Sequence, residues 1–129
     1  MKYKKLPLFM IGLLLLSMML AACGSATGSE FPTGKFIKSG SDTYGLAFNE
    51  DGTFSVFNGG TIFINGTYSV DGDVFTETSN SGGCVSPMKF NYTFDGTNLN
   101  FKYVGDPDDD FACGGRKTDF NNVTYTLTK

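Results

Sequence analysis

The feature that most constrains this chain is the close, regular spacing of glycine-containing turn pairs between short β-rich runs. Asn65-Gly66, Asp71-Gly72 and Asp95-Gly96 are such pairs, and Asn or Asp before Gly favours the tight turns of antiparallel hairpins because these residues tolerate positive φ. Within the runs, apolar residues recur at every second position, as they do over 88–94. This period is typical of strands. No segment keeps helical spacing for long, so helix is expected to be limited to a turn or two.

Nine short runs in roughly 95 residues meet this pattern, and we interpret them as about eight strands, a number that suits a small barrel. They are 36–38, 44–48, 53–57, 61–64, 67–70, 73–78, 88–94, 99–103 and 123–127. An up-and-down sheet that closes on itself removes its exposed edges. We therefore predict an all-β antiparallel meander forming a closed barrel, with a two-sheet β-sandwich as the alternative.

The first 22 residues have the order of an export signal. Lys2, Lys4 and Lys5 precede an apolar run over 6–20, and small residues follow at Ala21 and Ala22. A membrane-spanning helix needs about 20 apolar residues, and this run is shorter. Residues 1–22 are therefore predicted to be a signal peptide.

Leu20-Ala21-Ala22-Cys23 resembles the bacterial lipobox. The resemblance implies that Cys23 receives a diacylglycerol, that the chain is cut before it, and that the new amino end is acylated. Two or more acyl chains give durable anchoring. The implied partner is the membrane, and the implied location is the extracytoplasmic face of the cell membrane, at the cell surface or in the periplasm. The alternative is an uncleaved anchor helix that buries Cys23.

The predicted mature chain divides into a tether and one domain. Residues 23–30 are small and polar after the lipidated cysteine, which is typical of a flexible linker. Residues 31–129 are about 100 residues, the size of one domain. Removing the three signal lysines leaves seven basic against thirteen acidic residues, a net charge of about −6. Such a charge, without a basic cluster, argues against nucleic acid as a partner.

Two cysteines remain after Cys23, and both lie in glycine-rich loops. Cys84 and Cys113 form an even pair in a compartment that permits oxidation. We predict a disulfide between them, which would close a loop of about 30 residues and stabilise the fold by roughly 3 to 4 kcal/mol. The alternative is a redox-active or metal-binding pair. The chain has no histidine and no C-x-x-C spacing, so a zinc site is not expected.

The domain resembles the lipocalin-like, or calycin, β-barrels of bacterial lipoproteins. Gly34-Lys35-Phe36 stands where lipocalins show Gly-x-Trp, and Arg116 precedes the last strand, near the basic residue that lipocalins pack across that ring. The layout of 66–73, Cys84, 92–96, 99–101 and 113–116 is similar to that of the bacterial domain. Phe36 replaces the tryptophan, and the chain has no tryptophan, which counts against a biotin-binding barrel.

The resemblance implies a small apolar or amphipathic ligand in the barrel mouth. The alternative is that the same aromatic residues simply fill the interior of a packed envelope or cell-surface interaction domain. An open barrel predicts a cavity, and a packed one predicts an exposed apolar patch or strand edge. The residues expected to line the pocket or form the core are Phe36, Phe54, Tyr68, Phe75, Phe90, Tyr92, Phe101, Tyr103 and Tyr125.

Polar residues offer little chemistry. Asp106, Asp108 and Asp110 are a weak candidate for calcium, although the spacing lacks the EF-hand glycine and glutamate, and a solvated acidic loop is the alternative. No cofactor is expected. Catalysis is not expected either, because no histidine is present. A glycan hydrolase would require two carboxylates to meet in space, for which Glu77 and Asp95 are the candidates.

Overall fold

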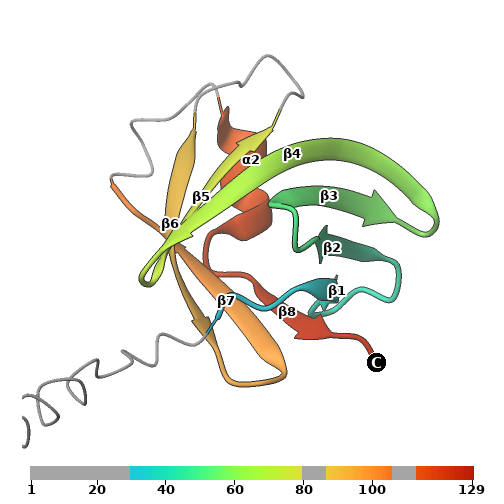
Figure 1. The fold of residues 1–129 in the computed structure, drawn as a ribbon. Helices are drawn as coiled ribbons and strands as arrows, with labels where there is room; N and C mark the ends of the chain where they lie inside the picture. Colours follow the sequence, from blue (N-terminus) through green and yellow to red (C-terminus); the bar gives the residue numbers. More distant parts are fainter. Residues whose placement is uncertain (1–29, 80–86, 106–112) are drawn as a thin grey trace, which may run out of the picture.

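A computed structural model of the chain describes residues 30–79, 87–105 and 113–129, and in it eight antiparallel strands form a closed barrel (Figure 1). Each strand pairs with the next, and β1 also pairs with β8, with Phe36 opposite Leu127. The predicted barrel is therefore confirmed, and the sandwich alternative is wrong. The strands are β1 (Gly34–Lys38), β2 (Tyr44–Phe48), β3 (Thr53–Asn58), β4 (Thr61–Asp71), β5 (Val74–Ser79), β6 (Met88–Phe94), β7 (Asn98–Tyr103) and β8 (Thr124–Leu127).

Two of the predicted turn pairs do join strands. Gly72 between β4 and β5 has φ of 62°, and Gly96 between β6 and β7 has φ of 95°, a region that favours glycine. The Asp95 carboxylate accepts hydrogen bonds from the backbone N–H groups of Thr97 and Asn98, at 2.9 and 2.7 Å. These bonds lower the pKa of Asp95 and stabilise the turn.

The third pair, Asn65-Gly66, does not form a turn. It lies inside β4, which runs unbroken through two of the predicted strands. A Cβ on Gly66 would lie 2.4 Å from the Thr78 carbonyl oxygen and 2.5 Å from Cε1 of Phe54. Gly66 is therefore needed because the neighbouring strand and the Phe54 ring approach closely, and not because the backbone turns there.

The two ends of the barrel are distinguished by the up-and-down topology. The chain enters β1 at one end, which also carries the turns after β2, β4 and β6; we call it the Phe31 end. The opposite end carries the β1–β2 and β3–β4 turns and the short helix α2 (Gly114–Phe120), and we call it the α2 end. Every strand and every buried core residue given by the structure lies within 31–129.

Helix α2 forms although it begins with two glycines, which are poor helix formers. Arg116 and Phe120 lie four residues apart on one face, and both are buried. The Phe120 ring lies 5.2 to 6.1 Å from the rings of Phe54, Phe75, Phe90 and Phe101. Tertiary packing of this face, and not intrinsic propensity, therefore accounts for the helix.

Candidate functional site

The predicted pocket-lining residues lie mostly in the packed interior. Six of them are at most 2 % exposed, Tyr92 is 7 % exposed, and Tyr68 and Tyr103 are half-buried. The space bounded by Phe54, Val56, Glu77 and Phe120 holds no volume large enough for a water molecule. The six are Phe36, Phe54, Phe75, Phe90, Phe101 and Tyr125. In the described part of the chain, these rings fill the barrel and leave no open calyx there.

The Phe31 end is closed by a side chain that sequence reasoning missed. Phe31 precedes β1, yet its ring is only 8 % exposed. Ring centroids from five strands surround it at 4.9 to 6.5 Å. They belong to Phe48, Tyr68, Phe75, Tyr92 and Phe101, which we call the aromatic box.

The two tyrosines of the aromatic box are fixed by their hydroxyl groups. Tyr68 donates to the carbonyl of Asn49 at 2.7 Å, and Tyr92 donates to the carbonyl of Gly72 at 3.4 Å. Burial raises the pKa of both hydroxyls, with smaller effects from nearby acidic residues, Asp51 and Glu50 for Tyr68 and Asp73 for Tyr92. Both therefore stay protonated donors at neutral pH.

An open groove of about 700 Å³ lies directly beside the box at the Phe31 end. Phe31 and Tyr68 form part of its wall, and exposed Glu30 and Glu50 add negative charge. The groove brings solvent to the edge of the box. The other residues that line it are Pro32, Thr33, Gly52, Ser69 and Val70.

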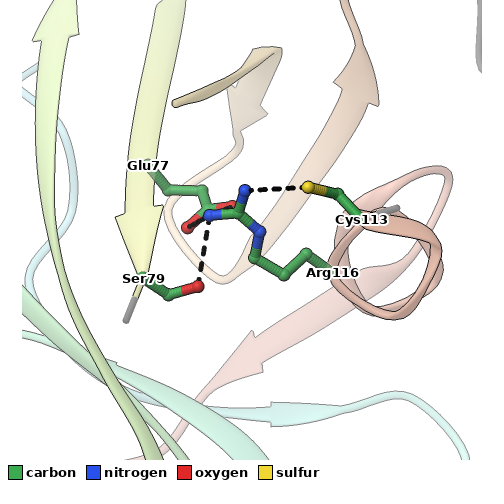
Figure 2. A network of polar contacts seen from close by, with 4 residues as sticks. All are labelled: Glu77, Ser79, Cys113 and Arg116. Atoms are coloured by element: carbon green, nitrogen blue, oxygen red, sulfur yellow. Dashed lines mark hydrogen bonds and ion pairs between the residues drawn. The ribbon is translucent and has the colours of Figure 1, made fainter. Parts of the chain in front are cut away.

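A buried ion pair lies at the α2 end (Figure 2). Arg116 on α2 places Nη1 3.0 Å from Oε1 of Glu77 on β5, and the two side chains are 6 and 0 % exposed. Nη1 also donates to Oγ of Ser79 at 3.2 Å, and Nη2 donates to Sγ of Cys113 at 3.4 Å. Charged groups removed from water require such partners. The pair therefore joins helix α2 to the barrel wall.

This arrangement bears on two expectations. The contacts given for Arg116 are with Glu77, Ser79 and Cys113, whereas the Phe36 ring meets Phe48 and Phe94. The packing of Arg116 across the first-strand ring, which the lipocalin resemblance implies, stays a prediction. Glu77 is at the α2 end and Asp95 is in the turn after β6, at the Phe31 end. The two candidate carboxylates of a glycan hydrolase therefore lie at opposite ends of the barrel.

An apolar surface lies on the β3–β4 hairpin at the α2 end. Ile62 and Phe63 are 55 and 49 % exposed, although both belong to β4. The register shifts after Val56, so that Phe63 is the extra residue of a bulge and its ring lies 5.8 Å from that of Tyr44. Bulges re-aim side chains in this way. The alternating pattern of the sequence did not predict this exposed pair.

Several predicted site residues lie outside the described residues. They are Cys23, Cys84, Asp106, Asp108 and Asp110. Cys113 is described and is 5 % exposed, but its predicted disulfide partner is Cys84, so that pairing stays a prediction. Within 30–79, 87–105 and 113–129, no group of three or more histidine, cysteine or acidic side chains is placed to hold a metal ion.

The remaining observations concern the membrane and other proteins. In the part of the chain that the structure describes, no helix is both long and apolar enough to cross a membrane. The features that distinguish this barrel, among the described residues, are the aromatic box, the groove and the buried ion pair. Comparison of the chain with protein-family models, with curated proteins and with solved structures gives no match, so what it does is inferred from its own residues and their geometry.

Proposed function

We propose that this chain is an exported lipoprotein, anchored by lipid on Cys23 to the extracytoplasmic face of the cell membrane. The basic start, the apolar run and Leu20-Ala21-Ala22-Cys23 support this proposal. The position of the domain agrees with it, because the closed barrel begins only a few residues after the tether, at Gly34. The lipid would hold the barrel near the membrane without a spanning segment.

Replacing Cys23 by alanine is expected to abolish lipidation and release the protein from the membrane. The thiol is the acceptor for the lipid, and a methyl group cannot replace it. Membrane fractionation and intact mass of the full chain, expressed in a bacterial host, measure this effect. Ser25→Ala is the matched control and should remain in the membrane fraction with the mass of the lipidated chain. Equal membrane retention of Cys23→Ala would contradict the proposal.

The barrel itself is proposed to bind a small apolar or amphipathic molecule at its Phe31 end. The single observation that carries this function is the aromatic box. Five strands present aromatic rings to Phe31, a residue that does not itself belong to the sheet. The groove of about 700 Å³ beside it gives access from solvent. Ligand sites are typically apolar pockets with a few fixed polar groups, here the Tyr68 and Tyr92 hydroxyls. We do not propose catalysis.

The second candidate is a packed interaction domain that binds another protein of the envelope or cell surface. The filled interior and the exposed Ile62 and Phe63 on the β3–β4 hairpin favour it. Exposed neighbouring apolar side chains of this kind occur at protein interfaces. The two functions use opposite ends of the barrel, so that they can be tested separately.

Native mass spectrometry of residues 24–129 is expected to separate the two candidates. This piece contains all eight strands and the described core. After exposure to lipophilic extracts, a ligand-binding barrel should carry an added mass that is released on denaturation. A clean apo mass under all conditions, together with loss of a partner on Phe63→Ser, would instead favour the interaction domain. An intact mass two hydrogens below that of the reduced chain would support the proposed disulfide between Cys84 and Cys113.

A further inference from the structure

Phe31 is a buried aromatic side chain that belongs to no strand or helix. Its ring stacks on Phe75 at 5.1 Å and meets Tyr92 edge-on at 4.9 Å. No hydrogen bond joins residues 30–33 to another described residue. In the described part of the molecule, apolar contacts, above all those of the Phe31 ring, therefore hold this segment in the barrel end without hydrogen bonds.

A glycine stands where the segment enters the barrel. Gly34 has φ of 122°, in the left-handed region that residues with a Cβ adopt only with strain. It is also the first residue of β1, and its partner on β2 is Phe48. A rotation at Gly34 would lift Phe31 out of the box, and the pairing of Lys35 to Ile37 with β2 would not have to change.

The aromatic box does not depend on Phe31 for its shape. Phe48, Tyr68 and Phe75 contact one another directly, with centroids 5.4 to 5.6 Å apart. The hydroxyls of Tyr68 and Tyr92 are bonded to the loop carbonyls of Asn49 and Gly72. Withdrawal of Phe31 would therefore leave a preformed space the size of one phenyl ring. Because aromatic rings pack favourably against one another, the surrounding rings favour an aromatic occupant.

The groove indicates what the occupant carries besides its ring. Glu50 is exposed in the wall of the groove that leads from Phe31 to solvent, and unlike Glu30 it does not belong to the segment that would move with Phe31; among the described residues, no basic side chain lines the groove. A carboxylate on the ligand would be repelled there, whereas an amine would be attracted. Because Glu50 is solvated, this preference should amount to a few-fold in affinity.

We propose that Phe31 occupies, within its own chain, a binding site for a small molecule with one flat aromatic ring and an amine group. The inference rests on the ligand-binding function proposed above and names its site and its ligand class. Phe31 and the ligand exclude each other from the box. The affinity of the wild-type chain is therefore the intrinsic affinity of the empty box multiplied by the fraction of molecules in which Phe31 has left it, and binding releases the segment 30–33.

Residues 24–129 in wild-type form and as Phe31→Ala are titrated with 2-phenylethylamine, and binding is followed by calorimetry. The Phe31→Ala variant is expected to bind at least tenfold more tightly, because the competing ring is gone. Phe63→Ala is the matched control, since it removes a ring at the α2 end that is 49 % exposed, and it should bind as the wild type does. The anion 3-phenylpropionate should bind several-fold more weakly than 2-phenylethylamine.

A second measurement uses only the wild-type chain. With the phenylalanine rings labelled for NMR, saturation of the wild-type chain with 2-phenylethylamine should move the Phe31 ring signals to solvent-exposed positions. The inference is overturned if the probe binds while these signals stay unchanged, or if Phe31→Ala is folded but binds no more tightly than the wild type. If Phe31→Ala does not fold, Phe31→Leu and the NMR titration decide.

The outcomes also separate this inference from the proposed function. An extract-derived ligand that binds without moving Phe31 would support the ligand-binding function and overturn the exchange with Phe31. Binding of 2-phenylethylamine with release of Phe31, but no ligand from any extract, would support the site and contradict a lipophilic cargo. Absence of binding in every experiment would overturn both.

Discussion

Replacing Glu77 by alanine is expected to destabilise the folded barrel by about 3 to 5 kcal/mol, because it leaves the Arg116 guanidinium buried without its counter-charge. Glu77 is fully buried and Arg116 is 6 % exposed, so that water screens the pair little. Ser79 and Cys113 accept hydrogen bonds from the guanidinium, but neither is expected to replace the carboxylate. Urea unfolding of residues 24–129, followed by circular dichroism, measures the loss as a lower transition midpoint.

The control is the double variant Glu77→Leu with Arg116→Met, which removes both charges and keeps apolar volume. Replacing a buried ion pair in this way is often neutral or stabilising. The double variant should therefore be more stable than Glu77→Ala alone by at least about 2 kcal/mol. If the two variants are equally unstable, the loss comes from packing, and the ion pair is not what joins α2 to the barrel wall.

The fold was predictable because its signals are local. Alternation of apolar residues along 88–94 predicts which side of β6 faces the core, and Met88, Phe90 and Tyr92 are indeed buried there. Asp71-Gly72 and Asp95-Gly96 predict turns from the conformations that two residues adopt. Asn65-Gly66 has the same local signal but is overridden, because the Phe54 ring and the Thr78 carbonyl require a residue without a side chain.

Four residues of the aromatic box, namely Tyr68, Phe75, Tyr92 and Phe101, were among the predicted pocket or core residues. The role of Phe31 and the buried ion pair were not predictable, because their contacts join residues far apart in sequence. Phe31 precedes the first strand, as an isolated aromatic residue after a polar linker, and nothing near it indicates that five strands will surround its ring. Arg116 and Glu77 are separated by 39 positions, and Arg116 follows two glycines that argue against a helix. Closure of the barrel creates both arrangements, and no local sequence pattern indicates which distant residues closure brings into contact.

Replacing Phe75 by alanine is expected to destabilise the barrel by about 3 to 5 kcal/mol, the range for deleting a buried phenylalanine ring. Phe75 on β5 is fully buried and contacts the side chains that close both ends of the barrel. Phe31 stacks on it at 5.1 Å, and Phe120 stacks on it at 5.9 Å. Loss of the Phe75 ring removes the surface on which both Phe31 and Phe120 pack. The free energy of unfolding, from urea titration of residues 24–129, measures the effect.

Val104→Ala is the matched control, because Val104 is 41 % exposed and its truncation creates no cavity; it should cost no more than about 0.5 kcal/mol. The structure also predicts coupling between Phe75 and Phe31. Once Phe75 is absent, the further loss on Phe31→Ala should be smaller than in the wild type, since the stacked contact is already gone. Additive losses would mean that the other four rings of the aromatic box hold Phe31, and that its contact with Phe75 does not contribute.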